Sequence, residues 1–491
     1  MADGSENPQA PIVPDEGQRS RIGVDEWVAS HEERTQGRSA LQRRLDLVPR
    51  PLLFAAFAAA AACVPFLTTN DYAIRVGFDT LLYMLLALGL NIVVGWAGLL
   101  DLGYVAFYGF GAYAYAMLAS PKFGIHWPTL GAIPVVVAAT MLLGWLVGLP
   151  SRRLTGDYLA IVTLFFGQFF VTVMNNGERI SVLGFTRGYD VTGGPNGIAN
   201  IDPFHLFGHQ LISVRSSYWL ALVTFSVVIA ALYLVNSSRT GRAWRSLRED
   251  PLAAELMGMP VNRLKLVAFA FGAGVAGLTG TLFASLNTAV FASDFDVPLL
   301  ITIYAMVILG GAGSLAGVIL GSITVNVSLE VLRTPGHATW VFYILVLASL
   351  IAKVRPWRWL AGVLAGTIAL GFAVHATVGA VWPRGTAAPI QSAGALSGFL
   401  KHWVVLPSNP QMIGNYVFVA LVLAILALTL LRDRLQKVAL APVLYLGAVV
   451  WENRLVEEPS ITRLILLGAL LIVLMNARPQ GIVGTARVEI A

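Results

Sequence analysis

The chain has 491 residues, of which 56% are hydrophobic and only 12% are charged, and its mean hydropathy is +0.71. A soluble domain carries roughly 25% charged residues, so this composition excludes a soluble protein and indicates a membrane protein with many spans. The net charge of +6 suits loops that face anionic lipid, so we expect membrane lipid, and no nucleic acid, as the partner of the basic residues. The single cysteine, Cys63, leaves no disulfide within the chain.

Residues 1–50 differ in composition from everything that follows. They carry nine acidic and seven basic side chains, and they lack the apolar core of a signal peptide. A segment this polar cannot bury enough apolar surface to fold by itself. We therefore predict a disordered, cytoplasmic N-terminal tail at 1–50.

Apolar runs recur along the rest of the chain, and each predicts a helix because a bilayer offers no water to an open backbone. They lie at residues 52–67, 78–96, 102–119, 129–149, 158–174, 218–235, 264–286, 298–309, 315–332, 340–352, 359–381, 413–431, 438–451 and 462–475. The predicted fold class is an all-α polytopic membrane protein with about 14 hydrophobic spans. In this count the basic clusters share one side, so the positive-inside rule predicts that both termini are cytoplasmic.

Glycines interrupt two of the apolar runs. One group is Gly95, Gly98 and Gly103, around Asp101, and the other is Gly310, Gly311, Gly313 and Gly317. Interrupted or re-entrant helices at membrane depth are tolerated where protein or a watery cavity covers the freed backbone, and such half-helix ends suit a polar substrate. The alternative is close packing of helices through small residues.

A basic loop at 237–264 separates two apolar runs and holds a short predicted helix of its own. Asp250 can cap this helix, Pro251 suits its first position, and Gly258 can end it. A short, capped helix that projects from a membrane bundle suits docking of a cytosolic partner. The alternative is an ordinary amphipathic turn at the membrane surface.

The sequence also indicates where the energy for any transport comes from. The segment GGAGSLAG lacks the Lys-Ser/Thr ending of a phosphate-binding loop, and His-rich metal spacing and a nucleophile elbow are missing. We therefore expect no enzyme activity, no metal and no bound nucleotide in this chain. Scarce charge within the spans argues against a proton- or sodium-coupled carrier, so energy is expected to arrive through contact with another protein.

Five motifs in order give the chain a family resemblance. Residues 91–98 (NIVVGWAG) run into LLDLGYVAFYGFGAYAYAML, and the others are GDYLAIVTLFFGQ (156–168), TGGPNGI (192–198), VILGGAGSLAGVILG (307–321) and RPQGIVG (478–484). Together they resemble the permeases of branched-chain amino-acid ABC importers, the LivM type. The resemblance covers about residues 52–332 and the last 25 or so.

The resemblance implies a set of partners. They are a LivH-like second permease, two cytosolic ATPases that use the ATP, and an extracytoplasmic substrate-binding protein. The basic loop would then be the coupling helix that docks on an ATPase, although Leu252 stands where that motif has glutamate. The residues implied in ATPase coupling are Arg248, Glu249, Asp250, Ala253, Ala254, Glu255 and Gly258.

The resemblance also implies a division of the chain and a path for the solute. We expect a permease core at 51–335 with the coupling loop at 237–264, an inserted hydrophobic region of about four spans at 336–460, and a final helix with a cytoplasmic tail at 461–491. The residues expected along the translocation path are Asn91, Gly95, Gly98, Gly103, Phe107, Gly111, Thr163, Gln168, Gly310, Gly311 and Gly313.

The expected function is import of Leu, Ile or Val across the inner membrane of a bacterial cell by alternating access. A permease for urea or short-chain amides is an alternative within the same class. From other classes, a self-sufficient secondary carrier and a membrane scaffold that transports nothing also remain open.

Overall fold

The computed structural model describes residues 50–154, 156–179, 190–206, 209–353, 357–386, 395–407, 409–431 and 433–457, with short pieces between 462 and 483. The tail predicted at 1–50 therefore lies outside the described residues except for Arg50. Part of the last apolar run, 462–475, and most of the tail after it also lie outside them.

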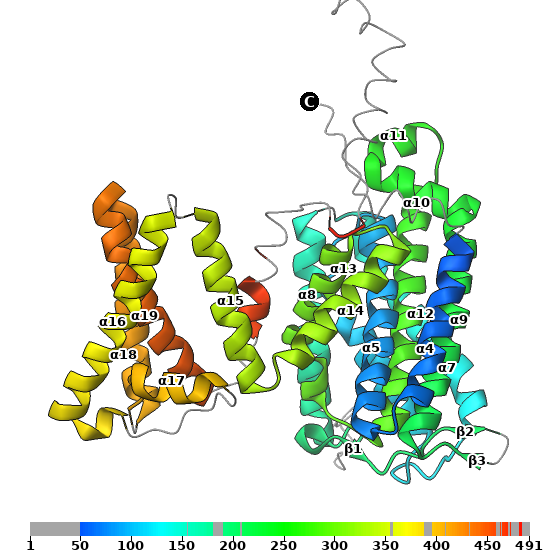
Figure 1. Cartoon of the computed structure of the whole chain (residues 1–491). Coiled ribbons are helices and arrows are strands. Elements are labelled where there is room, and N and C mark those ends of the chain that lie inside the picture. Colours follow the sequence, from blue (N-terminus) through cyan, green and yellow to red (C-terminus); the bar gives the residue numbers. More distant parts are fainter. Residues whose placement is uncertain are drawn as a thin grey trace, which may run out of the picture.

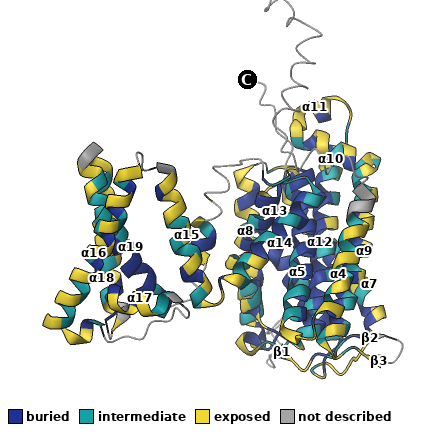
Figure 2. Ribbon diagram, viewed as in Figure 1, coloured by how far each residue is buried: buried dark blue, intermediate teal, exposed yellow. Residues whose placement is uncertain are grey.

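Nine α-helices of the described residues build a core bundle (Figure 1). They are α4 (Arg50–Leu67), α5 (Asp71–Leu90), α6 (Tyr104–Leu118), α7 (Thr129–Gly148), α8 (Asp157–Asn175), α9 (Val214–Ser237), α12 (Val261–Asn287), α13 (Val297–Gly310) and α14 (Leu315–Val331). Helices α5 and α12 lie at its centre: 72% and 67% of the residues in their apolar segments are buried, whereas the value is 22% for both α7 and α8. Figure 2 shows this burial as a dark interior.

The two ends of the bundle differ. At one end α10 (Arg239–Glu249) and α11 (Pro251–Leu256) project as a unit that we call the arm. At the other end lie short strands: β1 (Ile198–Ala199) pairs antiparallel with β4 (Ala289–Val290), and β2 (His205–Leu206) pairs antiparallel with β3 (His209–Gln210). We call these the arm end and the strand end (Figure 1).

Helices α15 to α19 form a second group beside the core (Figure 1). Their bounds are α15 (Pro335–Lys353), α16 (Trp357–Val381), α17 (Ala395–Trp403), α18 (Pro410–Leu430) and α19 (Asp433–Glu457). Separate clusters hold them together: Phe342 of α15 stacks on Trp451 of α19 with ring centroids 4.4 Å apart, and Trp403 packs against Tyr445. The division at 336–460 stays a prediction.

Within the described residues, nine helices are long and apolar enough to cross a membrane, or ten if one bent pair counts as a span. The bent pair is α14 with α15, and the chain bends by 114° between them. The expected count of about 14 is therefore only approximate. It counted short helices such as α6, of 15 residues, as full spans, and it treated the bent pair as two.

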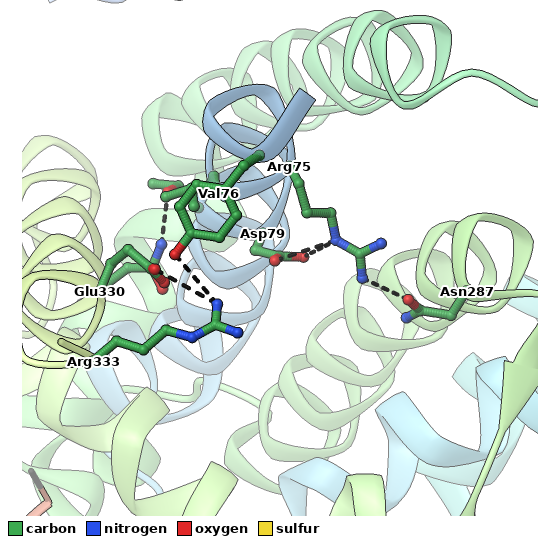
Figure 3. A network of polar contacts seen from close by, with 9 residues as sticks. Arg75, Val76, Asp79, Asn287, Glu330 and Arg333 are labelled. Atoms are coloured by element: carbon green, nitrogen blue, oxygen red, sulfur yellow. Dashed lines mark hydrogen bonds and ion pairs between the residues drawn. The ribbon is translucent and has the colours of Figure 1, made fainter. Parts of the chain in front are cut away.

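Charged residues near the strand end form local ion pairs and also donate hydrogen bonds to neighbouring helices (Figure 3). Arg75 of α5 lies 3.3 Å from Asp79 and donates to Asn287 Oδ1 at 2.5 Å, which ties α5 to the end of α12. Arg333 lies 3.6 Å from Glu330 and donates to the Tyr72 hydroxyl at 3.2 Å. These charges near helix ends therefore serve to hold α5, α12 and α14 together at this end.

Candidate functional site: a junction of two interrupted helices

The first interrupted helix is α5. It continues into a π-helix at Asn91–Trp96, η1, in which the backbone winds more widely than in an α-helix. Single π turns of this kind occur often at functional sites. Gly98 then has φ +71°, a left-handed conformation that favours glycine. The predicted break at 95–103 is therefore confirmed.

The second interruption follows α13. This helix ends at Gly310, and α14 begins at Leu315, capped by Ser314, whose hydroxyl accepts a hydrogen bond from Gly317 N at 3.1 Å. Between the helices Gly311 has φ +106° and Gly313 has φ +96°. Both values are costly for any residue with a Cβ atom.

Side chains join the two breaks directly. Gly313 N donates to Asn91 Oδ1 at 2.7 Å, and Trp96 Nε1 donates to Gly313 O at 3.1 Å. A Cβ atom on Gly95 would lie 2.6 Å from Gly313 N, so the two backbones approach as closely as glycine allows. We call this place, residues 91–98 with 310–314, the junction. It brings together six of the predicted path residues: Asn91, Gly95, Gly98, Gly310, Gly311 and Gly313.

The arm reaches the junction through two side chains. The Arg248 guanidinium donates to Gly95 O and, at 3.3 Å, to Ala312 O, one carbonyl in each break. Trp244, one turn earlier on α10, stacks on Trp96 with ring centroids 6.2 Å apart, and its Nε1 donates to Leu264 O at 2.9 Å. Arg248 was expected among the residues facing the ATPase, but the structure turns it inward to the junction.

A segment near the end of the chain also meets the junction. Ile482 N donates to Leu309 O at 2.8 Å, and Val483 N donates to Gly310 O at 3.1 Å. Gly481 has φ +77°, and a Cβ atom there would lie 2.6 Å from Gly311 N. Residues 481–483 of the RPQGIVG motif and the glycine-rich motif at 307–321 are far apart in sequence, yet they lie side by side.

Three further path residues lie apart from the junction, around the start of α6. Gly103 and Gln168 line a small hollow between α6, α8 and α13, together with Asp296. Thr163 lies next to it and accepts a hydrogen bond from Leu102 N at 2.9 Å. These nine predicted path residues therefore form two groups, and not one continuous wall.

Two predicted path residues pack inside the bundle. Phe107 is fully buried, with its ring centroid 5.4 Å from that of Phe166. Gly111 of α6 lies against the backbone of Gly277 of α12, so that any Cβ atom would collide with it. At Gly111 the structure places close packing of helices through small residues, the alternative that the sequence left open.

Sequence reasoning missed Asp101, which is fully buried in the connection between η1 and α6. Its Oδ1 accepts from Gly103 N at 3.0 Å, while no partner contacts Oδ2 among the described residues. Tyr304 of α13 donates to Asp101 O at 2.6 Å and accepts from Asp101 N at 3.1 Å. The signal that could have identified it was an acidic residue between glycines in an apolar run. An ionisable side chain within a membrane segment is costly and usually has a function.

The rest of the arm faces outward. Asp250 caps α11 by accepting from Leu252 N at 2.9 Å and Ala253 N at 3.0 Å, and Pro251 is the first residue of the helix, as predicted. Ala254 is buried against the bundle, while Leu252 is 73% and Leu256 88% exposed. The remaining expected coupling residues, Glu249, Asp250, Ala253, Glu255 and Gly258, are exposed.

A bundle of apolar helices with two joined breaks and a capped arm at one end is the architecture of a membrane transport permease. The chain matches the family described as "Branched-chain amino acid transport system / permease component" over residues 72–354. It belongs to this family. The match includes α15.

The similar proteins are permeases of two kinds. The chain is 35% identical over 336 residues to the high-affinity branched-chain amino acid transport system permease protein LivM of Salmonella typhimurium, covering 63% of this chain and 74% of LivM. LivM of Escherichia coli K12 is 35% identical over 335 residues with the same coverage. The corresponding LivH of Salmonella typhimurium is 24% identical over 264 residues, 50% of this chain and 80% of LivH. No solved structure matches the chain.

Proposed function

We propose that this chain is the permease subunit of an ATP-driven importer that carries branched-chain amino acids into a bacterial cell. The observation that carries the proposal is the junction, where two interrupted helices are joined to each other and to a projecting arm. Likeness to proteins named LivM supports the solute, and likeness to LivH supports pairing with a second, homologous permease.

The mechanism follows from the location of the arm. Two cytosolic ATPases dock on the arms of the two permeases, and closure of the ATPase dimer pushes α11. The junction and the hollow at Gly103 and Gln168 then change access from one side of the membrane to the other, as interrupted helices do in transporters. An extracytoplasmic binding protein delivers the solute at the strand end, and the arm end with both termini faces the cytosol.

Reconstituted transport tests this function. We expect proteoliposomes that hold this chain, the LivH-like permease and both ATPases to take up labelled Leu, Ile and Val when the binding protein is outside and ATP inside. Uptake by this chain alone without ATPases would identify a secondary carrier, and uptake of urea or short amides in place of Leu would reassign the solute. No flux with all partners present would identify a scaffold.

Docking on α11 makes a separate prediction about the exposed Leu252 and Leu256. Burial of a leucine side chain contributes about 2 kcal/mol, so Leu256→Asp is expected to weaken ATPase binding by about 30-fold. Co-purification of the tagged ATPases with the permease pair measures this loss. Ile212→Asp is the matched control, because Ile212 is 71% exposed but lies at the strand end. Equal retention of the ATPases by both variants would contradict docking on α11.

The acidic side chains of the arm give a second measure of the same contact. Glu249 and Glu255 are exposed, whereas Asp250 also caps α11. Substitution of the two glutamates therefore tests docking without removing the helix cap. Their reversal to lysine is expected to lower ATP-driven uptake relative to ATP hydrolysis, because complementary charges guide and align protein interfaces.

A further inference from the structure

We propose that Arg248 is the positioning residue that transmits movement of the arm to both helix breaks at once. This role rests on the proposed function, in which the arm is moved by an ATPase. It differs from the docking role that the sequence indicated, because the guanidinium donates to two backbone carbonyls of this chain.

The first argument is electrostatic. η1 ends at Trp96, so Gly95 O is among the last carbonyls of a helix, which have no partner within it. Ala312 O lies just beyond the end of α13. Two helices thus direct the negative ends of their dipoles to one point, and the Arg248 guanidinium donates to a carbonyl from each. Arg248 is a shared C-terminal cap of two membrane helices.

The second argument is steric. A Cβ atom on Gly98 would lie 2.9 Å from Arg248 Cγ, and one on Gly313 would lie 2.6 Å from Arg248 Nη1. Both glycines also have positive φ. The absence of side chains at Gly98 and Gly313, one in each break, therefore leaves space for the Arg248 side chain. A guanidinium needs this space because it is planar and rigid.

The third argument is mechanical. Trp244 and Arg248 are one turn apart on α10 and so share a face. Trp244 is fully buried and bonds to Leu264 O in the first turn of α12, which makes it a pivot. Arg248 lies toward the far end of α10, and only Asp250 separates α10 from α11. A push on α11 therefore turns α10 about Trp244 and moves Arg248 against the breaks.

The two breaks are bonded to each other, so such a movement would shift them together. Asn91 and Trp96 bond them to Gly313 at 2.7 and 3.1 Å, independently of Arg248. Loss of Arg248 therefore leaves the breaks joined to each other but removes the arm's hydrogen bonds to both of them, so that the stacking of Trp244 on Trp96 remains as a contact with the first break. The expected defect is lost coupling between ATP use and transport.

The experiment compares Arg248→Ala and Arg248→Lys with Arg245→Ala and Arg245→Lys in the fully assembled, reconstituted transporter. Arg245 is the matched control, because it is exposed on the same helix and donates to Asn236 Oδ1 and O at 3.2 Å. Three quantities are measured: ATPases retained on purification, ATP hydrolysed, and amino acid imported per ATP. Arg248→Ala is expected to retain the ATPases and to import about tenfold less per ATP, because hydrogen bonds to a charged group are the strong ones.

Each outcome decides the proposal. Import per ATP within twofold of the Arg245 variants would overturn it. If Arg248→Ala does not fold, the Arg248→Lys variant is the test, because lysine keeps the positive charge and loses only the two-pronged guanidinium. A fall in import per ATP for this variant supports the proposal, and an unchanged value overturns it. Loss of the ATPases from Arg248→Ala, with normal elution of the permease pair, would instead return Arg248 to docking. Failure of the unsubstituted complex to retain ATPases or to import would overturn the proposed function and not this link.

Discussion

Substitution of Gly313 by alanine is expected to abolish ATP-driven uptake while leaving most of the bundle folded. Gly313 has φ +96°, and a Cβ atom there would lie 2.6 Å from Arg248 Nη1 and 3.1 Å from Gly95 O. Backbone strain of this kind costs about 1–3 kcal/mol, and the side chain also displaces the guanidinium. Both penalties apply to the junction as this structure holds it, so we expect them to shift the conformational balance on which alternating access depends.

Uptake into proteoliposomes checks this prediction, with thermal unfolding of the purified permease pair as the measure of folding. Gly362→Ala is the matched control, because Gly362 lies within α16 and has open space around its Cβ position. We expect uptake by the control to be unchanged. Normal uptake by Gly313→Ala would show that the junction does not change shape during transport.

Substitution of Asp101 is expected to have the second large effect, and alanine and asparagine at this position are expected to differ in thermal stability. Asp101→Ala removes the acceptor for Gly103 N in a fully buried place. An unsatisfied buried donor costs about 1–3 kcal/mol, so this variant is expected to unfold at lower temperature and to lose uptake. Asp101→Asn keeps an acceptor oxygen of the same shape, so we expect its thermal midpoint to match that of the unsubstituted chain.

The physical reason lies in how the connection from η1 to α6 is held. Leu102 N bonds to Thr163 at 2.9 Å, Asp101 O and N bond to Tyr304, and Gly103 borders the hollow with Gln168. Loss of the Gly103 contact frees the connection next to that hollow. Equal thermal midpoints for the Ala and Asn variants would contradict this role for Asp101.

Local signals explain why the arm was predictable. Asp250, Pro251 and Gly258 define a helix start and stop within a few residues, and the observed α11 begins at Pro251 with Asp250 as its cap. Such a motif depends on neighbouring backbone groups alone. The same holds for the breaks, because closely spaced glycines mark backbone that other residues adopt only with strain.

The direction of Arg248 was not predictable from its position in the loop. It follows a run of basic residues, of which Arg242 and Arg245 are exposed and bond only to the nearby backbone and Asn236. Nothing in the sequence distinguishes Arg248 from Arg242 and Arg245. Only its contacts with Gly95 and Ala312, residues from two other helices, do so.

The amino-acid sequence alone was enough to predict a polytopic, all-helical permease of a branched-chain amino acid transport family, with two helix breaks and a capped arm. These properties follow from composition, hydrophobic runs and short motifs, which act within a few residues. The folded chain was needed to show that Asn91 bonds to Gly313, that Gly481 packs against Gly311, that Asp101 is buried, and that Gly111 packs against α12. The physical reason is that hydrogen bonds and close contacts between distant segments depend on how the helices pack, and local patterns do not specify that packing.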